Sequence, residues 1–226
     1  MKKKTFGVLL PLLGLSLYNS HARPKMINQQ QHTVMIAAPT TSKQVELTPK
    51  ERAYAVDLLT QTESAVFASV EGLTEAQLQF KSATDRWSIA ECIKHIAAAE
   101  KNLWELVDAS LKQPANPEKR AGIQFTDEQL IKAVEDRSHK SKTFAALEPE
   151  NSPYKTTKEA LAAFKENREK LIAFVKKTPD DLRNHVSVLP IGTYDAYQFI
   201  LLIPAHTNRH TQQIAEVKAD AGFPKS

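Results

Sequence analysis

The stretch Tyr194–Ala221, YDAYQFILLIPAHTNRHTQQIAEVKADA, decides the fold class of this chain. Its apolar residues recur at spacings of three and four, which is the period of an α-helix packed on a core. At about 100° per residue, one face within about 80° of His206 collects most of them; this face contains Phe199, Ile203, His210, Gln213, Ile214 and Val217. Gly222 and Pro224 follow and end the helix. The stretch therefore predicts a long helix with two histidines on its buried face.

The pair His206 and His210 predicts a metal site. Burying two imidazoles costs free energy unless their ring nitrogens find partners. Histidines at positions i and i+4 of a helix converge on one side, where a single divalent ion satisfies both. The alternative is a pair of core histidines that hydrogen-bond to carbonyl groups or to each other. The spacing favours the metal ion and leaves this alternative open.

A second helix, from Ser88 to about Leu111, carries a third histidine. Its apolar arc is formed by Ile89, Cys92, Ile93, Ile96, Leu103 and Val107. His95 lies at the edge of this arc, from which it can point toward a neighbouring helix and complete a three-histidine site with an open position. Glu100 falls near the centre of the arc and needs a partner, either a histidine N–H beside the metal or an Arg or Lys of another helix.

Four long helical segments predict an all-α protein, a four-helix bundle. They cover residues 48–72, 88–111, 155–177 and 194–221, and three begin or end at recognisable capping residues. Shorter helices are expected to start at Thr74 and Thr126. Residues 112–125 contain two prolines and a glycine and predict a loop, and residues 180–193 predict a connection that is extended around Val186–Leu189.

The N-terminal part predicts export. Residues 1–22 run from Lys2-Lys3-Lys4 through an apolar segment to Ser20-His21-Ala22, the order of a secretory signal peptide cleaved after Ala22. Residues 23–47 have no periodicity and predict a flexible linker, which leaves 48–226 as the folded domain. We therefore expect a periplasmic or secreted protein rather than a cytoplasmic one, with no stable membrane insertion after cleavage. The alternative is an uncleaved N-terminal anchor or a disordered tail.

Composition excludes several other classes of function. The 226 residues include only six glycines and no phosphate-binding loop, and the single cysteine, Cys92, allows no internal disulfide. The formal net charge of +4 owes much to the three lysines of the leader. Because no basic recognition helix is present, we expect no nucleic-acid partner.

Two motifs resemble those of a known family. Trp87-Ser88-Ile89-Ala90-Glu91-Cys92-Ile93-Lys94-His95 matches the W-S-x-x-E-x-x-x-H stretch of the DinB-like family. The segment from His206 to Ile214 matches its terminal H-x-x-R-H-x-x-Q-I. The resemblance extends over about residues 50–222. It implies an up-down-down-up four-helix bundle, often a dimer, whose zinc, nickel or similar ion is bound by His95, His206 and His210.

The resemblance implies a metal-dependent hydrolase acting on a small molecule, or a thiol S-transferase. Low-molecular-weight thiols are chiefly cytoplasmic, so an exported chain makes thiol transfer the less favoured of the two. Glu100 and Arg209 are candidate catalytic residues, although neither is clearly placed as a general base. The competing hypotheses are a non-catalytic metal-binding or stress-response module and a helical interaction domain without metal.

Overall fold

The computed structural model describes residues 45–139 and 142–225, so the predicted signal peptide and nearly all of the predicted linker lie outside the described residues. Six α-helices follow one another: α1 Pro49–Val70, α2 Glu75–Gln79, α3 Ile89–Leu111, α4 Asp127–Glu135, α5 Thr157–Lys177 and α6 Ala196–Lys218. Three 3₁₀ turns occupy Pro117–Gly122, Ala145–Leu147 and Pro149–Asn151, and two strands are β1 Val186–Leu189 and β2 Gly192–Asp195. The mostly helical architecture confirms the predicted fold class.

Local capping chemistry explains where the helices begin. Five of the six helices start at a capping box, in which a Ser or Thr side chain accepts from the backbone three residues on, and that residue's side chain accepts from the cap. The caps are Thr48, Thr74, Ser88, Thr126 and Thr156. Each such cap stabilises a helix by about 1 kcal/mol. Because these interactions are local, the sequence predicts the starts closely.

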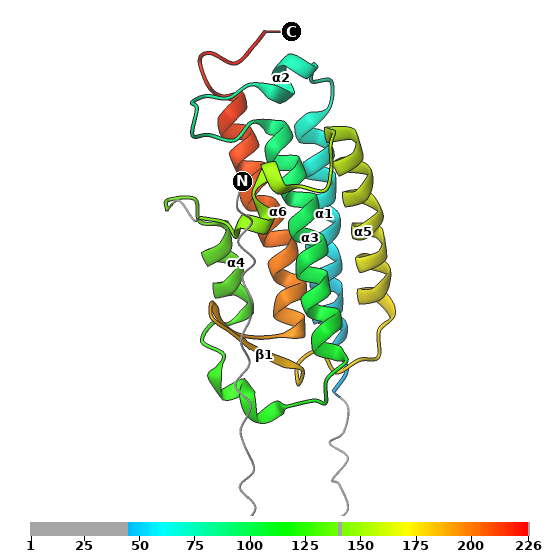
Figure 1. Cartoon of the computed structure of the whole chain (residues 1–226). Helices are drawn as coiled ribbons and strands as arrows, with labels where there is room; N and C mark the ends of the chain where they lie inside the picture. The colour runs from blue at the N-terminus through cyan, green and yellow to red at the C-terminus, as the bar shows by residue number, and fades with distance from the viewer. Residues whose placement is uncertain (1–44, 140–141, 226) are drawn as a thin grey trace, which may run out of the picture. The chain divides into compact units, whose positions relative to one another are not determined.

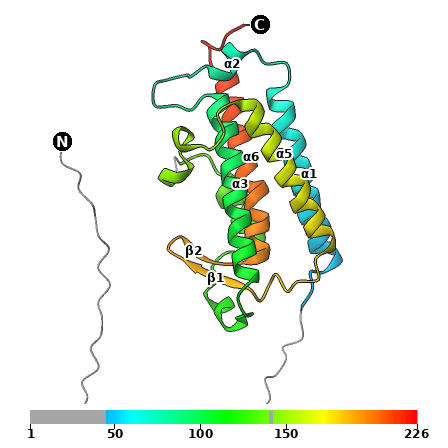
Figure 2. The same ribbon diagram turned by 45° about the vertical axis from the view of Figure 1, so that its right-hand side comes forward.

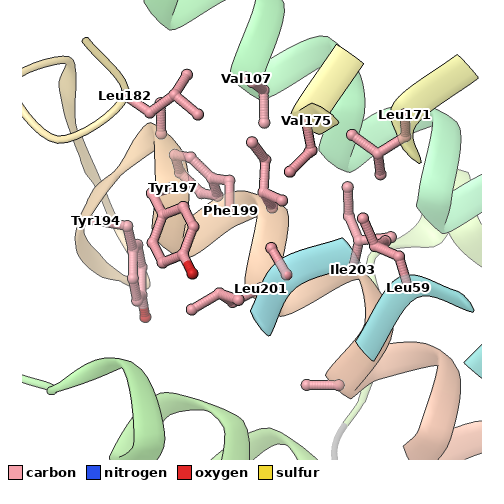
Figure 3. Packing of buried hydrophobic residues seen from close by; sticks show 14 of the residues in the cluster. Leu59, Val107, Leu171, Val175, Leu182, Tyr194, Tyr197, Phe199, Leu201 and Ile203 are labelled. Atoms are coloured by element: carbon pink, nitrogen blue, oxygen red, sulfur yellow. The ribbon is translucent and has the colours of Figure 1, made fainter. Parts of the chain in front are cut away.

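The four long helices form the bundle, in which α3 packs against α5 and α6, and α1 packs against the same two helices (Figures 1 and 2). The short helix α4 covers α6 from outside. Figure 3 shows the apolar core toward the end of the bundle that carries the strands, with side chains from every long helix: Leu59, Val107, Leu171, Val175, Phe199 and Ile203. Among the described residues, no helix is both long enough and apolar enough to cross a membrane.

The start of the last helix differs from the sequence-based expectation. Tyr194 was expected in the helix, but it belongs to β2, which pairs antiparallel with β1 in the register Ser187 to Tyr194. Gly192 opens β2 with φ of +135°, a conformation that residues with a side chain rarely adopt. The helix begins at Ala196, and the Asp195 side chain caps it by accepting from the backbone N–H of Gln198. The strand pairing overrides the apolar pattern that continues through Tyr194.

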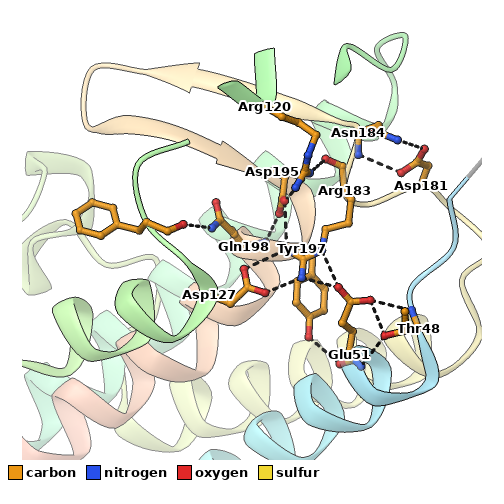
Figure 4. Close-up of polar contacts among 11 residues, drawn as sticks. Thr48, Glu51, Arg120, Asp127, Asp181, Arg183, Asn184, Asp195, Tyr197 and Gln198 are labelled. Carbon is orange, nitrogen blue, oxygen red and sulfur yellow. Dashed lines mark hydrogen bonds and ion pairs between the residues drawn. The ribbon is translucent and has the colours of Figure 1, made fainter. Parts of the chain in front are cut away.

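Below the bundle, Arg183 joins the starts of three helices (Figure 4). Its guanidinium donates to Glu51 in the first turn of α1, to Asp127 at the start of α4 and to Asp195, the cap of α6, at N–O distances from 2.6 to 3.2 Å. The same guanidinium lies over the Tyr197 ring, 4.1 Å from its centroid. This cluster fixes the N-terminal end of α6. It therefore also fixes the position along the helix axis of the histidines that follow.

Candidate metal centre

The structure brings three histidines from two helices together. His95 comes from α3, and His206 and His210 come from successive turns of α6. The Nε2 atom of His206 lies 3.2 Å from Nε2 of His95 and 3.2 Å from Nε2 of His210. His95 and His210 are buried, and His206 is half-buried. All three candidate ligand atoms lie within 4.8 Å of one another.

Hydrogen bonds at the far side of two rings set which nitrogen faces inward. Nδ1 of His95 lies 2.8 Å from the backbone carbonyl of Leu147, which can only accept, so Nδ1 carries the hydrogen. Nδ1 of His210 donates to Oε1 of Gln213 at 3.0 Å. The Nε2 atoms of both neutral rings therefore present lone pairs toward His206, whose Nε2 can supply at most one hydrogen. A cation between the three rings satisfies all three Nε2 atoms.

The spacing of the nitrogens suits a first-row divalent ion. With metal–nitrogen bonds of about 2.0–2.1 Å, two nitrogens 3.2 Å apart subtend roughly 100–106° at the ion, between the octahedral angle of about 90° and the tetrahedral angle of about 109°. Imidazole is a ligand suited to zinc, nickel, copper and iron. The three imidazole nitrogens therefore fit a divalent metal ion but do not distinguish among these metals.

Burial keeps the three rings in the form that binds metals. Burial lowers the pKa of His95, and burial together with the nearby His95 lowers the pKa of His206 to about 3. The pKa of His210 lies well below its ordinary value because of burial and the neighbouring His206. All three imidazoles are thus neutral at pH 7, and a neutral ring needs no proton removed before it coordinates an ion.

Trp87 covers the cluster on one side. Its ring centroid lies 4.8 Å from that of His95, and it stacks on His210 at 5.7 Å with an interplanar angle of 18°. Trp87 directly precedes the Ser88 cap of α3, so the helix start positions it. A large indole at this place holds two of the rings in orientation and keeps water from their faces.

Glu100 finds its partner in an arginine of another helix, which is one of the two partners that the sequence left open. Arg168 of α5 donates through Nε and Nη2 to the two carboxylate oxygens of Glu100 at 2.9 and 2.8 Å, with both side chains almost fully buried. The same guanidinium donates to the carbonyl of Leu59, to Thr62 and to Thr207. Within the described chain, neither oxygen of Glu100 bonds to a histidine, and a catalytic role for it stays a prediction.

Arg209 borders a cavity that opens beside the histidines. The cavity has a volume of about 480 Å³ and is lined in part by Trp87, Arg209, His210 and Gln213. Its size lies within the range of about 300–1,000 Å³ that is usual for small-molecule sites. The cluster is therefore not sealed in the core, because His210 lines space that a small molecule can enter.

Three hydrogen-bond partners at the site are not identified by the sequence patterns. Gln213 follows His210 by three residues, a helical spacing that identifies it in retrospect as the partner of Nδ1. Arg168 could have been any cation on any helix. The Leu147 carbonyl belongs to a 3₁₀ turn in the connection between α4 and α5. A pattern of side chains does not predict which backbone oxygen will accept from a histidine.

Comparison with known proteins points to one family. The model of the DinB superfamily matches residues 58–214. The uncharacterised protein YuaE of Bacillus subtilis (strain 168) is 25% identical over 154 residues, which cover 66% of this chain and 88% of YuaE. Among solved structures, YfiT from Bacillus subtilis superimposes with a TM-score of 0.54 at 16% identity, covering 83% of this chain and 95% of YfiT. YfiT is described as a probable metal-dependent hydrolase with an unusual four-helix bundle topology.

Proposed function

The chain belongs to the DinB superfamily, and from that premise we propose that His95, His206 and His210 bind one zinc or nickel ion at the centre of a metal-dependent hydrolase. The observation that carries the proposal is the convergence of three Nε2 atoms, two of them with lone pairs directed inward by Leu147 and Gln213. The description of YfiT as a probable metal-dependent hydrolase supports the same assignment.

The presence of three protein ligands and an adjoining cavity favours a catalytic ion over a purely structural one. Structural zinc sites are normally closed by four protein ligands, whereas catalytic sites use three and keep a position for water or substrate. When bound, the ion would supply Lewis-acid activation of water or of an acyl carbonyl group. Hydrolysis adds water to the acyl carbon and breaks its bond to the leaving oxygen or nitrogen, which takes up a proton. Trp87 and His210 line the cavity in which the substrate would lie.

The order of helix directions implied by the resemblance, up-down-down-up, is part of the same proposal. Figure 1 supports it, since α1 and α6 rise from the end that carries the strands while α3 and α5 descend toward that end. Adjacent helices of the same direction need a long connection. Residues 112–156 provide it between α3 and α5, and this connection includes the turn whose Leu147 carbonyl holds His95.

Metal analysis combined with an activity screen tests the proposal. We expect the purified chain to take up one zinc or nickel ion, and loading at 100 times the dissociation constant to stabilise the fold by about 2.7 kcal/mol. Hydrolysis of 4-nitrophenyl acetate and of a panel of esters and amides should vanish on chelation and return when metal is restored. Absence of stoichiometric uptake would contradict metal binding. Uptake without metal-dependent hydrolysis would indicate a non-catalytic metal-binding module.

Replacing Gln213 by alanine should weaken metal binding by roughly 10- to 100-fold, the effect usual for losing the outer partner of a metal-binding histidine. The change frees Nδ1 of His210, so the ring loses its fixed orientation and tautomer. The affinity is measured by competition with a chromophoric chelator. Gln212→Ala is the matched control, because this neighbouring amide donates to the Glu135 carbonyl and has no hydrogen bond to a described histidine. Equal affinities of the two variants would contradict the role of Gln213.

A further inference from the structure

The cavity beside the histidines is lined by more positive than negative side chains. Four cationic residues border it: Arg86, Arg137, Lys142 and Arg209. Three carboxylates border it as well: Asp85, Glu148 and Glu216. A divalent ion on three neutral histidines would add two positive charges without any compensating ligand charge. The chemistry of the lining therefore favours a ligand that brings negative charge.

Arg137 contributes little to this excess, because it is already neutralised. Its Nε and Nη2 atoms donate to the two carboxylate oxygens of Glu216, each at 2.6 Å. Such a bidentate pair balances the charge of the guanidinium and occupies its Nε and Nη2 edge, and Nη1 donates to Oε1 of Gln213 at 3.4 Å. Arg209 on α6 is the next cation to consider, because its hydrogen-bond partners indicate whether its charge is free for a ligand.

The guanidinium of Arg209 is held by backbone carbonyl groups. Its Nη1 atom donates to the carbonyl oxygens of Val134, at 3.2 Å, and of Asp136, and its Nη2 atom donates to that of His139 at 2.8 Å. Carbonyl oxygens fix the orientation of the group but bring no net charge. No carboxylate among the described residues forms a salt bridge with it.

Three of the five N–H donors of Arg209 are engaged in this way, which leaves two for a ligand. The residue precedes His210 directly, and Arg209 and His210 both line the cavity. We propose that Arg209 is a specificity-determining residue that binds an anionic group of the substrate, a carboxylate or a phosphate, while the group to be hydrolysed lies at the histidines. This inference rests on the proposed function for the reacting end of the substrate, but anion binding itself does not require hydrolysis.

Calorimetric binding of small anions tests the proposal independently of activity. Succinate and inorganic phosphate are titrated into the metal-loaded and the metal-free chain, with neutral succinamide as the comparison. We expect at least one of the two anions to bind in both forms, succinamide to bind far more weakly, and Arg209→Gln to weaken anion binding roughly tenfold or more, as is typical for loss of hydrogen bonds to a charged group. Which anion binds decides between carboxylate and phosphate.

Arg52→Gln is the matched control. Arg52 also donates to two backbone carbonyls, those of Val175 and Thr178 at 2.6 and 3.0 Å, but it does not line the cavity beside the histidines. Thermal unfolding of both variants shows whether each is folded. If neither anion binds the wild type, if succinamide binds as well as succinate, or if Arg209→Gln and Arg52→Gln behave alike, the proposal is wrong.

A substrate pair adds a readout on the reaction. Mono-4-nitrophenyl succinate has a charged carboxylate at its far end, where its methyl ester has a neutral group. Hydrolysis of the nitrophenyl ester bond in either probe consumes one water and releases 4-nitrophenol. Arg209→Gln should lower kcat/KM for the charged probe roughly tenfold more than it lowers kcat/KM for the methyl ester. If neither probe is hydrolysed by the wild type, the proposed hydrolase activity on such esters fails, and the calorimetric result still decides on anion binding.

Discussion

Replacing His206 by alanine is expected to abolish tight metal binding while the bundle stays folded. Its Nε2 atom is the one that lies 3.2 Å from both other ring nitrogens, so its removal leaves two ligands that no longer enclose an ion. The loss should exceed the roughly 100-fold that removal of an outer partner can cause. His206 is half-buried, and a folded core should tolerate its truncation. Metal content after dialysis and competition with a chelator measure the effect, and circular dichroism reports the fold.

His185→Ala provides the control for the loss of a histidine. Its Nδ1 atom lies 2.9 Å from the Ser110 carbonyl, and the residue is half-buried outside the cluster. This variant should bind metal like the wild type. Retention of one ion at wild-type affinity in His206→Ala would rule out the three-histidine site. A structural ion would give a different result. His206→Ala would then unfold when a chelator removes its remaining metal, and chelation would not change the activity of the wild type.

Replacing Arg168 by methionine should have the largest effect on stability. The change leaves the buried carboxylate of Glu100 without a counter-charge and removes the donor to Thr207, beside His206. Breaking a buried ion pair from one side costs about 3–5 kcal/mol, which is a large share of the total stability of about 5–15 kcal/mol for a domain. Urea denaturation of the wild type and the variant measures the difference.

Two further variants separate the buried charge from other causes. The double variant Arg168→Met and Glu100→Leu should recover much of the loss, because replacing both partners by apolar groups leaves no unpaired charge. Lys170→Met, on the same helix, breaks an exposed ion pair with Glu166 and should change stability far less. If Arg168→Met is as stable as Lys170→Met, the buried pair does not contribute as described.

Sequence patterns predict the local parts of this structure well and the long-range parts only in outline. The caps at Thr48, Ser88 and Thr126 are readable because both partners lie within four residues. The i and i+4 spacing of His206 and His210 likewise places them on one face without knowledge of the rest. The edge position of His95 allows it to reach a neighbouring helix, and the family motif adds that this neighbour is the helix of His206 and His210.

The remaining features depend on contacts that no local pattern encodes. That Glu100 needs a partner follows from its place on the helix, but Arg168 is 68 residues away and competes with other cations as a candidate. Tyr194 continues the apolar pattern of the last helix, but it lies in a strand because it pairs with Ser187. The carbonyl groups that hold His95 and Arg209 come from backbone whose course is set only by the assembled fold.

The buried guanidinium of Arg168 also bears on how the bundle assembles. Its hydrogen bonds reach Leu59 and Thr62 in α1, Glu100 in α3 and Thr207 in α6, so one side chain of α5 is satisfied only when all four long helices are in place. An intermediate that lacks one helix would leave part of this polar centre either unpaired or open to water. The arrangement therefore disfavours partly assembled forms and makes folding of the four helices more nearly all-or-none.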